Sequence, residues 1–348
     1  MIRFVRLAAC HATLALTIVG HAGAQVAQAP KYVQRLELPS RTDGFRRPAA
    51  VVADLHAGEV FVCGTWNNRI VIYDQLGSFR YQIQGGTVFR SPIDLAVDPD
   101  GYIFVLAWRE GERSIVRLDF DGLFIEEIPV PTDEVADVPP EPVSISISPA
   151  GDRLYLLDRS AHRLWITGRD GEVVGSADLS GESTDEELQE RVYGHVDAYG
   201  DRVLVANATL GRILLFDLEG NPQGHVGRKG TATCQSAFPT GGAMNRDGEV
   251  FILDKQRMLF TLWRAEDNQC LGEFSGIGRS PGALYAPDDI ALDGRGRIYI
   301  SQTFEGRVQV FDDATPAAVP EPAVARADGP LGPDDAADAA PTDATPSR

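Results

Sequence analysis

A pattern that recurs six times dominates this sequence and limits the folds that it can adopt. Each copy contains an opening residue with an apolar run, a turn of Asp and Gly, a strand rich in Val, Ile and Tyr, a polar turn with Arg, and a further strand. The spacing between copies, about 44 to 51 residues, is typical of the blades of a propeller. The copies open at Pro48, Pro92, Pro142, Tyr193, Pro239 and Pro287.

Each copy can be divided into four short strands. Val, Ile, Tyr and Phe dominate these strands, and Asp-Gly, Ala-Gly or Asn-Asn pairs fall between them, as short antiparallel strands require. Four-stranded blades repeated around a central channel form a β-propeller. We therefore expect an all-β fold, a six-bladed β-propeller of four-stranded antiparallel blades. In the first copy the expected strands are Ala49 to Ala53, Glu59 to Cys63, Arg69 to Tyr73 and Phe79 to Gln84.

The last copy lacks a fourth strand on its C-terminal side. Its third strand, Arg307 to Phe311, is followed by a stretch of Ala, Pro, Asp and Thr. A spare strand, Tyr32 to Leu38, precedes the first copy. We predict that this N-terminal strand completes the last blade, because pairing the two ends of the chain leaves no open sheet edge at the seam.

Composition divides the 348 residues into three parts, 1–24, 25–312 and 313–348. The first reads as a signal peptide, because Arg3 and Arg6 precede an apolar stretch from Leu14 to Val19 and small residues follow. The last has no aromatic residue, so we expect a disordered acidic tail. The middle part is the propeller, which we expect to be periplasmic or extracellular. No other segment approaches the roughly 20 apolar residues of a membrane span.

The charge of the chain narrows the choice of partner. The net charge is -18, and no cluster of Lys and Arg stands out against it. An acidic surface lacks the counterion release that supplies affinity for nucleic acid, so we expect no nucleic-acid partner.

Two connections, Pro131 to Pro142 and Ser183 to Val192, are inserted between a fourth strand and the next first strand. Loops on one face of a rigid ring are where we expect a protein, peptide or small-molecule ligand.

Three segments of the repeats share a further pattern: Asp98 to Gly101, Asn67 to Ile70 with Tyr73, Asp74 and Gly77, and Gly306 to Val308 with Phe311 and Asp312. In these segments the chain resembles the NHL-repeat family of propellers, and the match covers roughly residues 31 to 312. The resemblance implies a six-bladed ring, here of an exported bacterial type, but no single activity, because such propellers include scaffolds, sensors, lyases and lactonases. The fourth copy departs from the family pattern where Tyr193 replaces the opening Pro.

One position in each copy is expected to face the central channel near its mouth. It is the second residue after the opening residue, and from the first copy to the sixth it is Ala50, Asp94, Ser144, His195, Gly241 and Asp289. Asp94, His195 and Asp289 would then converge on the channel axis. Carboxylates with one imidazole suit calcium or a borderline metal such as zinc. The alternative is a solvated polar channel without a metal.

The end of the second strand carries a second recurring polar position. It is occupied by Gly64, Asp158, Asn207, Asp254 and Gln302. In most copies we expect this residue to anchor the turn that leads to the following Arg. Asn207 and Gln302 depart from the common Asp, so they are further candidates for ligand binding.

The hypothesis that these residues support is a non-catalytic binding or scaffold propeller. The alternative is a metal-dependent lyase or lactonase, which the weaker resemblance to the amidating lyases of peptide hormones and to gluconolactonases implies. Such lyases rely on several His residues, whereas only His195 falls at an inward position here.

Without the signal peptide, three cysteines remain, Cys63, Cys234 and Cys270. We expect no Cys234–Cys270 disulfide, because the two were assigned to opposite faces of the ring and a bridge needs Cα atoms within about 7 Å.

Overall fold

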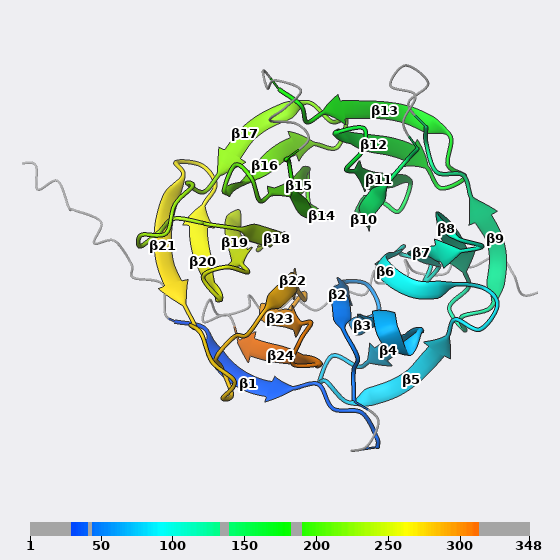
Figure 1. Cartoon of the computed structure of the whole chain (residues 1–348), viewed down its shortest axis with the longest axis horizontal. Helices are drawn as coiled ribbons and strands as arrows, with labels where there is room; N and C mark the ends of the chain where they lie inside the picture. The colour runs from blue at the N-terminus through cyan, green and yellow to red at the C-terminus, as the bar shows by residue number, and fades with distance from the viewer. Residues whose placement is uncertain (1–28, 41–43, 133–138, 182–189, 313–348) are drawn as a thin grey trace, which may run out of the picture. The chain divides into compact units, whose positions relative to one another are not determined.

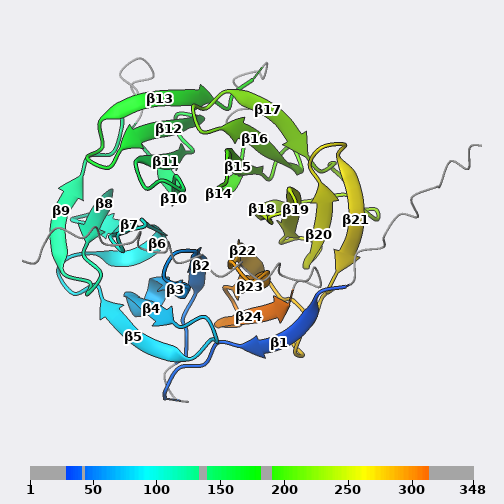
Figure 2. The ribbon, with the colours of Figure 1, turned by 180° about the vertical axis from the view of Figure 1, so that it is seen from behind.

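In a computed structural model, the described residues 29–40, 44–132, 139–181 and 190–312 form a ring of six four-stranded sheets (Figures 1 and 2). They all belong to one compact unit, Met1–Pro316. The predicted signal peptide and the predicted acidic tail lie outside the described residues, as do parts of the two insertions. The six-bladed β-propeller predicted from the repeats is confirmed.

Five blades are built from consecutive strands, and the first strand of each lies nearest the channel (Figure 1). Blade 1 contains β2 (Pro48–Asp54), β3 (Glu59–Gly64), β4 (Arg69–Tyr73) and β5 (Phe79–Gln84). Blade 2 contains β6 (Arg90–Val97), β7 (Ile103–Arg109), β8 (Glu112–Leu118) and β9 (Phe124–Ile128). Blade 3 contains β10 (Pro142–Ile147), β11 (Arg153–Asp158), β12 (Arg163–Gly168) and β13 (Val173–Asp178). Blade 4 contains β14 (Tyr193–Tyr199), β15 (Arg202–Asn207), β16 (Arg212–Asp217) and β17 (Pro222–Val226). Blade 5 contains β18 (Pro239–Met244), β19 (Glu249–Asp254), β20 (Leu259–Arg264) and β21 (Gln269–Phe274).

Blade 6 is assembled from both ends of the folded chain. Its strands β22 (Pro287–Leu292), β23 (Arg297–Gln302) and β24 (Arg307–Asp312) are followed outward by β1 (Lys31–Arg35). The N-terminal strand pairs antiparallel with β24, with Lys31 opposite Asp312. It ends before the predicted Leu38, although the N–H of Leu36 still donates to the Val308 carbonyl (2.9 Å). The predicted closure by the N-terminal strand therefore agrees with the structure.

The recurring Asp-x-x-Gly motif has a local role in the turns. The Oδ1 atom of Asp98 accepts hydrogen bonds from the N–H groups of Asp100 (3.0 Å) and Tyr102 (2.9 Å), which lie two and four residues later. Gly101 has φ +86°, a conformation that strongly favours glycine. Asp74, Asp119, Asp217 and Asp293 make the same pair of bonds. The motif thus closes tight turns between consecutive strands.

Apolar runs in the second and third strands pack between neighbouring blades. Ile70 of blade 1 and Val105 and Val116 of blade 2 belong to one cluster of buried side chains. All five residues of β4 are buried. A strand covered on both faces needs a continuous apolar run, which explains why the repeats are so rich in Val and Ile.

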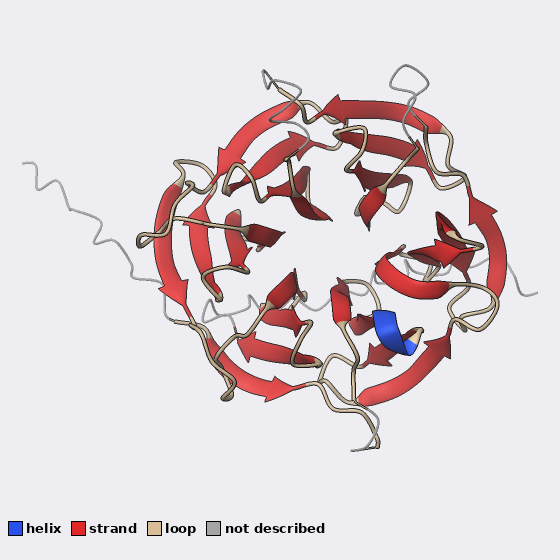
Figure 3. Ribbon diagram, in the orientation of Figure 1, coloured by secondary structure: helices blue, strands red, loops and turns tan. Residues whose placement is uncertain are grey.

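Helix is nearly absent from the described residues. Figure 3 shows one short 3-10 helix, η1 (Thr65–Asn67), between β3 and β4. None of the helices in the described part of the chain is long and apolar enough to cross a membrane.

The prediction that Cys234 and Cys270 are not bridged is wrong. They form a disulfide with Cα atoms 5.9 Å apart. The prediction assumed that the connection between β17 and β18 stays on one face of the ring. Instead this connection reaches the outer strand β21, where the N–H of Cys234 also donates to Oε1 of Glu273 (2.7 Å). Cys63 is a free, fully buried thiol.

Candidate functional site

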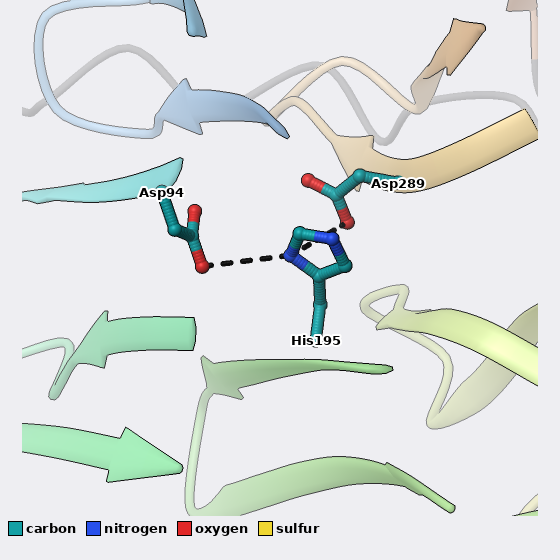
Figure 4. A group of neighbouring side chains, drawn as sticks. All are labelled: Asp94, His195 and Asp289. Atoms are coloured by element: carbon teal, nitrogen blue, oxygen red, sulfur yellow. Dashed lines mark ion pairs between the residues drawn. The ribbon is translucent and has the colours of Figure 1, made fainter. Parts of the chain in front are cut away.

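Four of the predicted site residues meet at the channel. Asp94, Ser144, His195 and Asp289 come from the innermost strands β6, β10, β14 and β22, each at the equivalent position of its blade. Figure 4 shows the imidazole of His195 between the carboxylates of Asp94 and Asp289. The Nδ1 atom of His195 lies 3.5 Å from Oδ2 of Asp94 and 3.7 Å from Oδ1 of Asp289. We call Asp94, His195 and Asp289 the channel cluster.

Three of the polar residues at this position, Asp94, Ser144 and Asp289, also join their blade to the next one. Asp94 Oδ2 accepts hydrogen bonds from the Ser144 hydroxyl (2.5 Å) and the N–H of Ile145 (3.1 Å) in blade 3. Ser144 Oγ accepts the N–H of Val196 (3.0 Å) in blade 4. Asp289 Oδ2 accepts the N–H of Val51 (3.0 Å) in blade 1. A structural function of the position is therefore to satisfy backbone groups at the edge of the neighbouring inner strand.

The two carboxylates compensate for blades that have no polar side chain at this position. Ala50 and Gly241 precede Asp94 and Asp289 around the ring and offer no acceptor. In their place, Asp94 Oδ1 accepts the N–H of Leu95 (2.8 Å) and Asp289 Oδ1 accepts the N–H of Ile290 (2.8 Å). Each Asp thus uses one oxygen within its own strand and the other across the blade boundary. Both oxygens of each carboxylate are therefore hydrogen-bonded, which offsets the cost of burying side chains that are only 2% and 5% exposed.

Burial and charge shift the protonation of the channel cluster. Burial alone would lower the pKa of His195, but the Asp289 and Asp94 carboxylates outweigh it and raise the pKa to about 10. Burial raises the pKa of Asp289 to about 7; the His195 imidazole opposes this rise and the Asp94 carboxylate adds to it. Burial and the same two carboxylates raise the pKa of the Cys63 thiol, so this cysteine stays protonated.

A cavity of about 130 Å³ extends from the channel cluster along the inner strands. Its lining reaches Leu55, Pro99 and Pro149, in the turns that connect first and second strands. The cavity therefore runs away from the face that carries the insertions, a direction that was not predicted from the sequence. Asp197, whose pKa burial raises to about 7 and which lines the same cavity, was not predicted either. The available signal was its position two residues after His195, which places both on one side of the strand.

Asn207 and Gln302 do not join the channel cluster. Both are fully buried at the ends of second strands. Asn207 Oδ1 accepts the N–H of Leu210 (3.0 Å), and Gln302 Oε1 accepts the N–H of Tyr285 (2.9 Å) and a guanidinium hydrogen of Arg307 (3.1 Å). They anchor turns as Asp158 and Asp254 do in other blades. Ligand binding by Asn207 or Gln302 stays a prediction, and neither side chain is exposed to a ligand.

A second feature lies where second and third strands connect. Three aromatic side chains are exposed there: Phe304 (78%) and Trp66 (68%) in the turns of blades 6 and 1, and Trp108 (41%) near the end of β7 in blade 2. The guanidinium of Arg47 lies over the Trp66 ring, 5.6 Å from its centroid. These residues were not predicted from the sequence, although an aromatic residue in or beside a predicted polar turn is a recognisable signal.

These aromatic side chains occupy neighbouring parts of one face, which we call the loop face. The N–H of Trp66 donates to the Arg46 carbonyl (3.1 Å), and the adjoining Phe45 lies against Gly306 in the turn of Phe304. On the other side, the hydroxyl of Thr65 donates to the Pro92 carbonyl (2.8 Å) at the entrance of blade 2. The turns of Phe304 and Trp66 and the end of β7, where Trp108 pairs with Arg90, therefore belong to neighbouring parts of blades 6, 1 and 2.

Comparison with solved structures identifies similar rings. The chain is similar to a protein of unknown function from Bacteroides thetaiotaomicron, with 14% identity, a TM-score of 0.59, and coverage of 82% of this chain and 73% of that one. It is also similar to the β-propeller domain of Cps50 (Swd1) from Myceliophteria thermophila, with 11% identity, a TM-score of 0.53, and coverage of 81% and 99%. A third similar structure is streptogramin B lyase, with 14% identity, a TM-score of 0.55, and coverage of 81% and 98%.

These similarities show a β-propeller fold and nothing finer. No family model matches the chain, and no curated protein matches it. Function must therefore be argued from the site, because one propeller architecture hosts many unrelated activities.

Proposed function

We propose that this protein is a binding module that engages a protein partner through its loop face. The observation that carries the proposal is the group of three exposed aromatic side chains, Phe304, Trp66 and Trp108, above three consecutive blades. Exposed aromatic residues gathered in one region are unusual on a protein that has no partner. Trp and Tyr are also enriched among the residues that dominate binding energy at protein interfaces.

The shape and charge of this region favour a protein segment over a small molecule. The aromatic side chains come from two turns and the end of a strand in three different blades, whereas small ligands usually bind in one enclosed pocket. An open groove of about 440 Å³ lies beside Trp108 and is bordered by Arg90 and Arg109. Arg46 and Arg47 are exposed next to Trp66. A segment that carries apolar side chains together with carboxylates would complement this surface.

The alternative function, a metal-dependent lyase or lactonase, has weaker support. The cavity beside the channel cluster, at about 130 Å³, is smaller than the roughly 300–1,000 Å³ of typical small-molecule sites. Both carboxylates are nearly fully buried, so little of either is open to a substrate. The similarity to streptogramin B lyase concerns the fold alone. These observations favour a binding module over an enzyme.

We also propose that the chain is an exported propeller of the NHL type. The family assignment is supported by the Asp-x-x-Gly and Asn-x-Arg-Ile segments of the repeats. Export is supported by the signal-peptide pattern in residues 1–24 and by the Cys234–Cys270 disulfide, because structural disulfides persist in oxidising compartments.

Site-specific crosslinking in the native host tests the proposed function. A photoreactive amino acid is placed at Trp66 and, as a control, at Phe120, a 63% exposed side chain in a turn between third and fourth strands. We expect a protein that crosslinks at position 66 and not at position 120. Its affinity for the purified ring should then fall at least about 10-fold in a Trp66→Ala/Phe304→Ala variant and stay unchanged in Phe120→Ala. Equal crosslinking at both positions, or equal affinity of both variants, would refute the proposal.

A further inference from the structure

The cavity beside the channel cluster has an unbalanced charge. Four aspartates line it, Asp54, Asp94, Asp197 and Asp289, together with the imidazoles of His56 and His195. Among the described residues that line this cavity, none is Lys or Arg. Even a protonated His195 leaves the carboxylates in excess. Buried charge without a counter-charge is costly, so the cavity favours a bound cation.

The spacing within the channel cluster suits one metal ion. The ligand atoms of Asp94, His195 and Asp289 all lie within 4.8 Å of one another. His195 Nδ1 is 3.5 and 3.7 Å from the nearest carboxylate oxygens, longer than the roughly 2.7–3.2 Å of a good N–H···O bond. Two ligand atoms about 2.1 Å from a tetrahedral ion would be about 3.4 Å apart. The observed separations therefore fit shared coordination better than direct hydrogen bonds.

The orientation of the carboxylates is fixed by contacts outside the cluster. The N–H groups of Leu95 and Ile145 hold the two oxygens of Asp94, and those of Ile290 and Val51 hold the oxygens of Asp289. Hydrogen bonds of this kind, made behind the ligand atoms, orient metal ligands and preserve the geometry of a site. The positions of the two carboxylates are thus set by backbone groups of blades 1, 2, 3 and 6 before any ion binds.

We propose that the channel binds one divalent transition-metal ion, with Asp94, His195 and Asp289 as its protein ligands and the remaining coordination positions facing the cavity. One imidazole with two carboxylates matches the preferences of zinc. Calcium usually takes six to eight oxygen ligands, and the cluster offers two carboxylates and a nitrogen. The ion would tie together blades 2, 4 and 6, which alternate around the ring. This inference does not depend on the proposed loop-face partner.

Metal titration of the chelator-treated chain tests the proposal, with Zn²⁺ and Ca²⁺ as the probes. We expect calorimetry to give one Zn²⁺ per chain and a rise in melting temperature on binding. His195→Gln and Asp289→Asn should each weaken Zn²⁺ binding at least about 100-fold, more than the loss of a residue that only orients a ligand. His56→Gln is the matched control, because this imidazole lines the other end of the same cavity, and it should bind Zn²⁺ as the wild type does.

Cobalt provides a readout that does not depend on thermal stability. Co²⁺ bound to the wild-type chain should give visible d–d absorption that Zn²⁺ abolishes, and His195→Gln should lack this absorption while its far-ultraviolet circular dichroism stays unchanged. The absence of stoichiometric Zn²⁺ binding would overturn the proposal. Equal losses in His56→Gln and His195→Gln would overturn the assignment of the ligands, and binding of Ca²⁺ in preference to Zn²⁺ would overturn the class of metal.

Discussion

A single position of the repeat, the second residue after the opening residue, does two things in this ring. At Asp94, Ser144 and Asp289 it supplies the hydrogen-bond acceptor for a backbone N–H of the next blade. At His195 it supplies an imidazole between two carboxylates. The architectural use needs any acceptor, whereas a metal needs this particular set. Substitutions that keep one use and remove the other can therefore separate them.

Ser144→Ala tests the architectural use. It removes both the acceptor of the Val196 N–H and the hydroxyl that donates to Asp94 Oδ2 inside a fully buried site, so we expect the free energy of unfolding to fall by about 1–3 kcal/mol. Ser146→Ala is the matched control, because Ser146 Oγ accepts the Ala198 N–H in the same way (3.1 Å) but faces the cavity. Water can replace that acceptor, so its loss should stay below about 1 kcal/mol. Urea unfolding of both variants checks this, and equal losses would contradict the reasoning.

The register of the repeats is what made the channel cluster predictable from sequence. Aligning the opening residues placed Asp94, His195 and Asp289 at equivalent positions, and symmetry brought them to one axis. The alignment could not reveal the direction of the cavity or the participation of Asp197, because both depend on how far the inner strands separate below the cluster. Asn207 and Gln302 seemed unusual in sequence, yet an amide oxygen anchors the turn as a carboxylate oxygen does.

At the scale of elements, the strands lie where the repeat pattern predicts them, whereas the connection between β17 and β18 does not stay on the face that was predicted for it. The first predicted strand, Ala49 to Ala53, lies within β2, because alternating turns and apolar runs define short strands well. The connection between β17 and β18 carries no periodicity. It reaches the outer strand of blade 5, where Cys234 meets Cys270. Assigning this loop to a face from topology alone therefore failed, because the loop extends to the outer strand β21.

The N-terminal strand β1 is the element with the largest predicted effect. A chain that begins at residue 36 would leave β24 as an open edge and lose the β1–β24 ladder. At roughly 0.5–1.5 kcal/mol for each hydrogen bond, we expect a loss on the order of 3 kcal/mol in unfolding free energy and a tendency to self-associate. A chain that begins at residue 29 is the control, because it retains β1 and should match the longer chain. Urea unfolding and light scattering would test this, and an unchanged chain from residue 36 would exclude closure by β1.

At the scale of the whole molecule, two features lie on different surfaces of one rigid ring. Trp66 and Phe304 lie on the loop face, and neither lines the cavity that extends from the channel cluster. We therefore expect independent behaviour: Trp66→Ala should bind Zn²⁺ with unchanged affinity, and His195→Gln should keep its affinity for the loop-face partner. Calorimetry of each variant with each ligand measures this. A coupled loss in either direction would mean that the channel and the loop face form one site.

The number of cysteines that react with a maleimide tests both the removal of residues 1–24 and the Cys234–Cys270 disulfide. The chain has four cysteines, and removal of residues 1–24 takes Cys10 away. In the folded protein Cys63 is fully buried with a raised pKa, so we expect no reaction with a maleimide of high mass. After denaturation without reductant one label should add, at Cys63, and after reduction three should add. Two labels without reductant and four after reduction would mean that Cys10 is retained and the leader is uncleaved. Three labels without reductant would mean that Cys234 and Cys270 are not bridged.

The disulfide should also stabilise the fold, because it closes a segment with a sequence separation of 36. We expect reduction to lower the unfolding free energy by about 2–4 kcal/mol, and a Cys234→Ser/Cys270→Ser variant should show no further response to reductant.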